Sequence, residues 1–200
     1  MKVGVLAMQG AFREHGQVLQ SCGCEPVEVR KAEHLEGLAG LIIPGGESTA
    51  IGKLLVDFGL LSVIQNFGKK GFPIFGTCAG LILLAKDIVD SKQPRLGLMD
   101  ITAKRNAYGR QVDSFEIDLP VPEIGETPIR AVFIRAPYIE RVGPDIQVLA
   151  AYQDKVILAR QGNLLAAAFH PELTGDFRLH QYFIGMCEEY VKPIDRDGGH

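Results

Sequence analysis

The sequence predicts an α/β protein in which a mostly parallel sheet carries helices on both faces and gains antiparallel strands in its second half. Three observations lead to this prediction. Short apolar runs alternate with helix-like stretches through the first half of the chain. These runs lack the polar alternation of half-exposed strands, which is typical of parallel strands buried on both faces. From Gly97 onward, closely spaced apolar runs joined by short turns favour antiparallel additions.

In the first half, each short apolar run predicts a strand, at residues 3–8, 26–29, 41–43 and 73–75. The third of these strands must stop at Pro44-Gly45-Gly46. Between the strands, apolar residues at helical spacing predict helices, with Gly59 dividing two of them. The expected helices cover residues 12–20, 51–58, 61–67 and 79–85, and a short helix or loop covers 32–38.

The second half predicts mainly strands and ends in a helix. Strands are expected at residues 98–103, 112–117, 129–134, 147–152, 156–159 and 164–169. Asp176 is expected to cap the last helix, because an aspartate carboxylate can accept the free N–H groups of a first turn. The apolar residues that follow have helical spacing. The sequence predicts one domain over residues 1–193 and a polar tail over 194–200, with no internal repeat.

Composition excludes several classes of protein. The chain has 200 residues, of which 46% are hydrophobic, a formal charge of −3 and a mean hydropathy of +0.10. Such a chain can close a core, and its overall charge does not favour binding to nucleic acid or an anionic membrane. Its longest uncharged run, residues 71–85, is shorter than the roughly 20 residues of a membrane span. Four scattered cysteines fit a reducing, cytoplasmic location better than a disulfide scaffold.

One cysteine has the sequence surroundings of a nucleophile. Gly76, Cys78 and Gly80 form a G-x-C-x-G segment between an apolar strand and an apolar helix. A nucleophile on such a tight strand-to-helix turn needs small neighbours on both sides. The N-terminus of the helix favours a thiolate, and the Ala79 N–H is placed to receive an oxyanion. A free cysteine is more often simply buried, but the flanking glycines favour catalysis here.

The base that such a nucleophile needs is expected at the end of the strand over residues 164–169. His170 is followed there by Pro171 and Glu172. Proline biases the preceding residue toward extended backbone, in which residues two apart point the same way. The carboxylate could therefore fix the imidazole tautomer while the other ring nitrogen faces the sulfur of Cys78.

A glycine-rich loop, Pro44-Gly45-Gly46-Glu47-Ser48-Thr49, follows the third strand and precedes a helix. Its backbone N–H groups could bind an oxyanion or a carboxylate. A phosphate cradle is disfavoured, because the chain has neither Gly-Lys-Ser/Thr after this loop nor a G-x-G-x-x-G segment. In a parallel sheet, this loop, the cysteine turn and the histidine all lie at the carboxyl ends of strands, where open α/β sheets place their sites.

Together these motifs resemble the class I, triad-type glutamine amidotransferases, which have a flavodoxin-like core. Further segments resemble one group of them, the glutaminase subunits of pyridoxal 5′-phosphate synthase, and they occur in the same order from Lys2 to about Val191. These segments are Met8-Gln9-Gly10-Ala11-Phe12-Arg13-Glu14-His15, Gly45-Gly46-Glu47-Ser48-Thr49, Arg105-Asn106-Ala107-Tyr108-Gly109-Arg110-Gln111, Ile134-Arg135-Ala136-Pro137 and His170-Pro171-Glu172-Leu173-Thr174.

The resemblance implies a role for each matching residue. Cys78 would be the nucleophile, His170 the acid and base, and Glu172 its orienter, with the N–H groups of Gly46 and Ala79 receiving the oxyanion. The residues implied to hold L-glutamine are Gly46, Glu47, Ser48, Arg105, Ile134 and Arg135. The residues implied to face a synthase subunit, which would accept ammonia, are Gln9, Gly10, Ala11, Arg13, Glu14 and His15. No cofactor and no metal are implied.

Two other functions stay open at this point: the glutaminase subunit of a different amidotransferase, and a PfpI-like cysteine hydrolase or peptidase. A non-catalytic module is disfavoured because Cys78, His170 and Glu172 are all present. The remaining cysteines and histidines carry no chemical prediction. His180 in particular has no convincing partner in the sequence.

Overall fold

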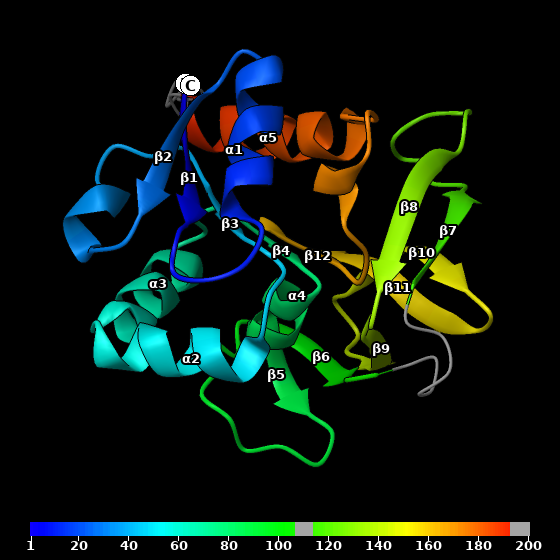
Figure 1. The fold of residues 1–200 in the computed structure, drawn as a ribbon, viewed down its shortest axis with the longest axis horizontal. Helices are drawn as coiled ribbons and strands as arrows, with labels where there is room; N and C mark the ends of the chain where they lie inside the picture. The colour runs from blue at the N-terminus through cyan, green and yellow to red at the C-terminus, as the bar shows by residue number, and fades with distance from the viewer. Residues whose placement is uncertain (107–113, 193–200) are drawn as a thin grey trace, which may run out of the picture.

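One large sheet runs through the middle of the molecule between two helical layers (Figure 1). The computed structural model describes residues 1–106 and 114–192, so the predicted tail lies outside the described residues. The helices are α1 (Phe12–Ser21), η1 (Ala32–Leu35), α2 (Ser48–Asp57), α3 (Leu60–Lys69), α4 (Ala79–Leu84), η2 (Pro171–Leu173) and α5 (Arg178–Val191). The strands are β1 (Lys2–Leu6), β2 (Glu25–Val29), β3 (Leu41–Ile43), β4 (Ile74–Thr77), β5 (Ala85–Ile88), β6 (Met99–Lys104), β7 (Ser114–Leu119), β8 (Ile129–Ile134), β9 (Tyr138–Val142), β10 (Gln147–Tyr152), β11 (Lys155–Gln161) and β12 (Leu164–Ala167).

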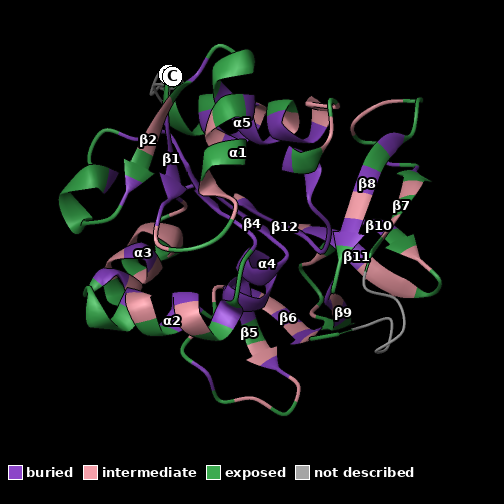
Figure 2. Ribbon diagram, in the orientation of Figure 1, coloured by how far each residue is buried: buried purple, intermediate pink, exposed green. Residues whose placement is uncertain are grey.

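The strand order confirms the predicted fold class. In the described part of the chain the large sheet runs β2-β1-β3-β4-β12-β11-β9-β6-β5, β10 pairs with β11, and β7 and β8 form a separate hairpin. Neighbours from β2 to β12 are parallel, and β11 pairs antiparallel with β12, β9 and β10. Strands β1, β3, β4 and β12 are almost wholly buried (Figure 2), as their unbroken apolar sequences predict.

Two observed strands, β5 and β9, were not predicted. Strand β5 starts directly after α4, where the helix was expected to end, and pairs parallel with β6 at the sheet edge. Strand β9 was not predicted because most of its residues are exposed and it contains no apolar run. The strand expected at 112–117 is observed as β7 from Ser114, and its first two residues lie outside the described part.

The strands that precede the three motifs are neighbours. Strand β4 pairs parallel with β3 on one side and with β12 on the other, with Gly76 opposite Ile43 and Thr77 opposite Ala167. Parallel neighbours end at the same edge of a sheet. The loops that follow β3, β4 and β12 therefore meet at one place.

Helices cover both faces of the parallel strands, with α1 and α5 on one face and α2, α3 and α4 on the other (Figure 1). Helix α4 is buried along its whole length. The predicted cap of α5 is wrong, because the N-cap residue is Phe177 and its side chain cannot accept a hydrogen bond. Asp176 stands one residue earlier, where its carboxylate accepts the Arg178 backbone N–H at 3.1 Å and pairs with the Arg178 guanidinium.

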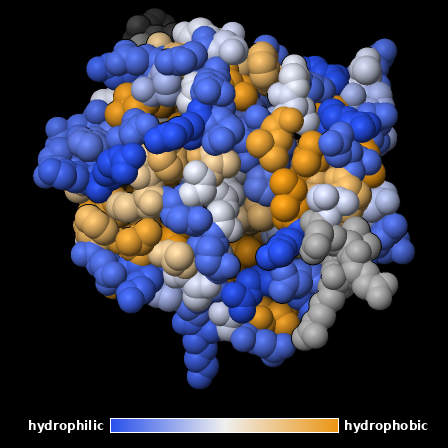
Figure 3. Space-filling model, in the orientation of Figure 1, coloured by the Kyte–Doolittle hydropathy of each residue, from blue (hydrophilic) through white to orange (hydrophobic). Residues whose placement is uncertain are grey.

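Polar side chains cover most of the face seen in Figure 3, and apolar ones lie between them in separate groups. Among the described residues, no single helix has both the length and the apolar composition needed to cross a membrane. Helices α2 and α3 have the necessary length and apolar composition only when they are taken together, and the chain bends by 98° between them.

Candidate active site

Cys78 lies in a sharp turn between β4 and α4, with φ 51° and ψ −101°. This is a sparsely populated conformation for a residue with a side chain. Its N–H donates to the Ala167 carbonyl at 2.8 Å, which ties the turn to β12. The two flanking glycines lie against each other, since a Cβ on Gly76 would collide with the carbonyl of Gly80. The G-x-C-x-G spacing is therefore what allows this turn to form.

His170 and Glu172 are brought beside Cys78 from the end of β12. The His170 Nδ1 atom lies 2.7 Å from Glu172 Oε1, and the ring also forms a hydrogen bond with Cys78. The two residues meet in a different way from the one expected, because Pro171 begins the single turn η2 rather than an extended segment. The His170 backbone N–H donates to Val132 in β8 at 2.8 Å, which also holds the ring in place.

The surroundings of His170 favour its protonated form. Burial alone would lower the pKa of His170, but hydrogen bonds with Cys78 and Glu172, and the charges of these two groups, outweigh it and raise the pKa to about 10. Glu172 is almost wholly buried, so water screens its charge little. An imidazolium beside the sulfur stabilises a thiolate, which is the reactive form of cysteine.

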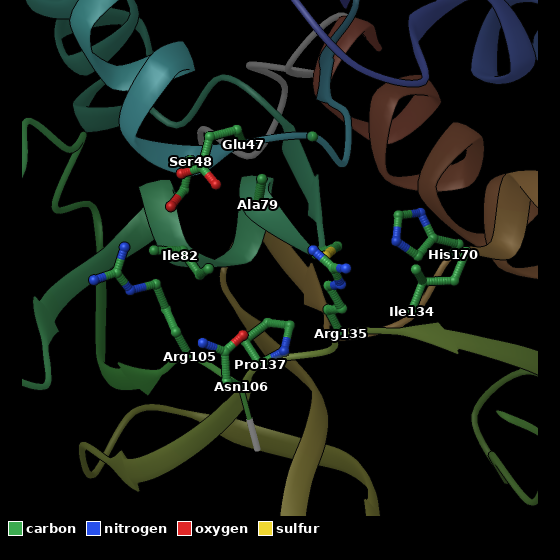
Figure 4. A pocket seen from close by; sticks show the side chains of 12 residues that line it. Glu47, Ser48, Ala79, Ile82, Arg105, Asn106, Ile134, Arg135, Pro137 and His170 are labelled. Atoms are coloured by element: carbon green, nitrogen blue, oxygen red, sulfur yellow. The ribbon is translucent and has the colours of Figure 1, made fainter. Parts of the chain in front are cut away.

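A cavity of about 470 Å³ opens in front of these residues (Figure 4). Glu47 and Ser48 border it from the start of α2, and Arg105 and Arg135 approach from the opposite side. Glu172 lies behind His170 and does not line it. The lining residues are Gly46, Glu47, Ser48, Cys78, Ala79, Ile82, Arg105, Asn106, Ile134, Arg135, Pro137 and His170. This wall offers cations and a carboxylate around a nucleophile, which suits a small zwitterion.

Glu47 is held in its charged form. Its carboxylate accepts hydrogen bonds from the hydroxyl and the backbone N–H of Thr49, and these two bonds lower the pKa of Glu47. Partial burial opposes this shift, and the charge of Arg105 supports it. A carboxylate is therefore present at the cavity at neutral pH.

Comparison with known proteins decides the family. The model of the SNO glutamine amidotransferase family matches residues 5–189. The chain belongs to this family. Pyridoxal 5′-phosphate synthase subunit PdxT of Pelotomaculum thermopropionicum is 63% identical over 187 residues, which are 94% of this chain and 95% of that protein. The subunit PdxT of Moorella thermoacetica is 62% identical over 186 residues, 93% and 99% of the two chains.

A solved structure described as a glutamine amidotransferase superposes on the chain with a TM-score of 0.89. It is 53% identical in sequence and covers 93% of this chain and 98% of its own. The resemblance drawn from the motifs is thus confirmed, and the protein is a glutaminase of the glutamine amidotransferase type.

The structure of this amidotransferase also contains a residue that the motifs did not indicate. Gln93 is buried beside the cavity, and its Oε1 accepts hydrogen bonds from Arg105 at 3.3 Å and from the Ser48 hydroxyl at 3.4 Å. It thereby joins two of the residues implied to hold glutamine. Gln93 comes from the irregular segment between β5 and β6, and no spacing in the sequence distinguishes it.

The N-terminal segment implied to face a partner lies against the glycine-rich loop. The Gln9 side chain accepts the Glu47 N–H at 2.8 Å, and the Ala11 N–H donates to the Gly45 carbonyl at 3.0 Å. Gln9, Gly10, Arg13 and Glu14 are exposed, and Ala11 is partly exposed. His15 differs from them, because its side chain is fully buried and points toward Glu172. In this conformation a partner could touch the segment but not the His15 ring.

The structure thus brings most of the expected site residues to one cavity. Residues 107–111 of the motif that starts at Arg105 lie outside the described part of the chain. Among the described residues, no group of three histidine, cysteine or acidic side chains is arranged to hold a metal ion.

Proposed function

We propose that this chain hydrolyses L-glutamine at Cys78 and supplies the ammonia to the synthase subunit of pyridoxal 5′-phosphate synthase, for vitamin B6 synthesis. The observation that carries the proposal is the hydrogen-bonded series Cys78, His170 and Glu172 at a cavity with cations and a carboxylate on its walls. The PdxT relatives, which are named as subunits of that synthase, support the partner.

Glutamine has a carboxylate and an ammonium at one end and an uncharged amide at the other. Arg105 and Arg135 suit the carboxylate, and the ionised Glu47 suits the ammonium. Ser48 and the backbone near Gly46 and Ile134 complete the contacts. With the charged end held in this way, the side-chain amide extends toward Cys78.

The first half of the reaction forms a thioester. The Cys78 thiolate attacks the amide carbon, and the carbonyl oxygen becomes an oxyanion that accepts hydrogen bonds from the Gly46 and Ala79 N–H groups. When the C–N bond breaks, the His170 imidazolium gives its proton to the leaving nitrogen, and ammonia departs. Glu172 keeps the ring oriented and stabilises its positive charge.

The second half releases glutamate. His170, now neutral, accepts a proton from a water molecule as the water attacks the thioester carbon. The C–S bond then breaks, glutamate leaves, and the thiolate and imidazolium are restored. No cofactor takes part in either half.

Partner control is proposed to act through the glycine-rich loop. Removing one oxyanion donor costs about 100- to 1000-fold in rate, so a rotation of the Gly46 peptide would switch the enzyme on or off. Gln9 and Ala11 are both hydrogen-bonded to this loop. A synthase subunit that binds the segment formed by Gln9, Gly10, Ala11, Arg13 and Glu14 could therefore set the loop.

The same proposal places the enzyme in the cytoplasm as one catalytic domain over residues 1–193. Four free cysteines, three of them buried, support a reducing compartment. A separate subunit is proposed as the ammonia acceptor, because the PdxT relatives are named as subunits of a synthase.

The experiment is a glutaminase assay that measures glutamate and ammonia, with the chain alone and with a purified synthase subunit. We expect release that depends on Cys78 and rises when the pyridoxal 5′-phosphate synthase subunit is added. A rise only with a different ammonia-accepting synthase would contradict the partner. Cleavage of peptides without turnover of glutamine would contradict the reaction and favour a PfpI-like hydrolase.

A further inference from the structure

A second histidine reaches the catalytic carboxylate from inside the protein. The His15 Nε2 atom lies 3.4 Å from Glu172 Oε2 and 3.1 Å from the hydroxyl of Thr77, the residue before the nucleophile. The His15 Nδ1 atom lies 2.9 Å from His180 Nε2. Both His15 and His180 are fully buried, and they come from α1 and α5.

The hydrogen bonds indicate where the protons are. Within the described residues, His180 Nδ1 has no hydrogen-bond partner. A buried N–H without a partner is costly, so the His180 proton belongs on Nε2, where it is donated to His15 Nδ1. The neutral His15 ring must then carry its own proton on Nε2, which faces Glu172 and Thr77. Burial, followed by the nearby His180 and His170, keeps the pKa of His15 well below its usual value, in agreement with a neutral ring.

The Glu172 oxygen on this side needs a donor. Oε1 is bonded to His170, whereas Oε2 is buried and forms no hydrogen bond to any described residue. The His15 Nε2–H donates to the Thr77 hydroxyl at 3.1 Å and also faces Oε2 at 3.4 Å, so a small rotation of the ring would direct the same N–H to the carboxylate. An anionic oxygen in a dry interior gains much from such a donor.

We propose that His15 is a positioning residue for catalysis. It supports Glu172 on the side opposite His170, contacts Thr77 beside the nucleophile, and is held in the required tautomer by His180. Because His15 belongs to α1, it also connects the triad carboxylate to the helix that follows Gln9–Ala11. A movement of α1 therefore changes the orientation of His170 through Glu172. This role goes beyond the proposed mechanism, in which Glu172 orients His170 alone, and it rests on the glutaminase reaction.

The test compares His15→Phe, His15→Gln and His15→Asn in the complex with the synthase subunit. Phenylalanine keeps the shape without a donor, the glutamine amide places a donor near Nε2, and the asparagine amide places one near Nδ1. We expect His15→Phe to lower kcat by about 10- to 100-fold with KM for glutamine within about twofold, because a donor to a charged group is lost. His15→Gln should keep most of the activity, and His15→Asn should not.

A double mutant separates this role from a structural one. If His15 acts through Glu172, His15→Phe should change the rate less than about twofold when Glu172→Gln is already present. The downfield proton NMR line of His170 Nδ1–H should move in His15→Phe. Val18→Ala is the matched control, since Val18 is buried on the same helix; it should lower the melting temperature and leave both kcat and this line unchanged.

Several results would overturn the proposal. Wild-type kcat in His15→Phe would do so, and so would an equal loss with and without Glu172→Gln. If His15→Phe does not fold, equal activities of His15→Gln and His15→Asn contradict the role of the Nε2 donor. Failure of the wild-type complex to hydrolyse glutamine is a different result, because it contradicts the proposed reaction.

Discussion

Two imidazoles approach the buried carboxylate of Glu172, and their surroundings favour a positive charge on one ring and a neutral form of the other. His170 meets Glu172 at 2.7 Å and has its pKa raised to about 10, whereas His15 lies 3.4 Å from the same group and has its pKa lowered. His170 has a second acidic partner in Cys78 and borders the cavity, whereas His15 is fully buried beside another histidine. Direct hydrogen bonds with Glu172 and Cys78 therefore favour the charged form of His170, whereas complete burial and a neighbouring histidine favour the neutral form of His15.

The largest effect is expected from removing the Cys78 sulfur, which lies beside the charged His170 ring. Cys78→Ala should lower the glutaminase rate of the complex by about a millionfold, to background, because the thioester cannot form. The measurement is glutamate release at saturating glutamine. Cys22→Ala is the matched control, since Cys22 is a free cysteine that does not line the cavity, and it should keep wild-type activity. Measurable turnover by Cys78→Ala at a rate near wild type would exclude Cys78 as the nucleophile.

Removing the charge of Glu172 weakens the contacts that His170 and His15 both make with this side chain. Glu172→Gln keeps the shape of the side chain but loses the negative charge that holds the His170 imidazolium, so kcat should fall by about 1000- to 10,000-fold. Steady-state kinetics of the complex measure it. Glu116→Gln, which changes an exposed carboxylate on β7, should have no effect. A loss of less than tenfold in Glu172→Gln would show that Glu172 does not orient the base.

The neutral form of the buried histidines behind Glu172 can be tested by measuring the stability of the protein at low pH. Burial lowers the pKa of His180 to about 4, so between pH 6.5 and 4 the unfolded chain binds a proton that the native state does not. Stability therefore decreases as pH falls through this window, by about 3 kcal/mol from His180 at pH 4. His180→Leu should reduce this loss in urea unfolding measured at pH 4 and pH 7. An unchanged pH dependence would mean that His180 is charged in the native protein.

The smallest effect concerns the basic limb of the pH profile. The His170 imidazolium must protonate ammonia, so kcat/KM should decrease as pH rises through about 10. In Glu172→Gln the residual kcat/KM should begin to fall at a pH that is lower by about one unit or more. The reason is that this variant lacks a hydrogen bond and a negative charge that raise the pKa of His170. His180→Leu should leave the limb in place. A limb that is identical in Glu172→Gln and in the unmodified enzyme would contradict this assignment.

The sequence predicted the parts of the site that depend on local order. The G-x-C-x-G turn, the H-P-E segment and the glycine-rich loop each follow a strand, and β3, β4 and β12 are neighbours in the sheet. The same local signals were enough for the fold class. They were less useful for exposed strands such as β9, where no apolar run marks the strand.

The buried residues behind the site, His15, His180 and Gln93, could not be predicted in this way. His15 and His180 are separated by 165 residues and meet only because α1 and α5 cover the same face of the sheet. Because the two histidines are so far apart in the sequence, no partner was predicted for His180. His15 was predicted to face the synthase subunit together with its neighbours in the segment, which are exposed. Gln93 likewise gains its contacts with Ser48 and Arg105 from tertiary packing alone.

The His170 ring next to Cys78 is charged, whereas the His15 ring behind Glu172 is neutral. Nitrogen NMR of the complex with ¹⁵N-labelled histidine tests this difference directly at pH 8, with His170→Asn and His15→Gln to assign the signals. We expect both nitrogens of His170 to be protonated and His15 to have one protonated nitrogen, Nε2. A neutral His170 in the active complex, or a doubly protonated His15, would contradict this difference in charge.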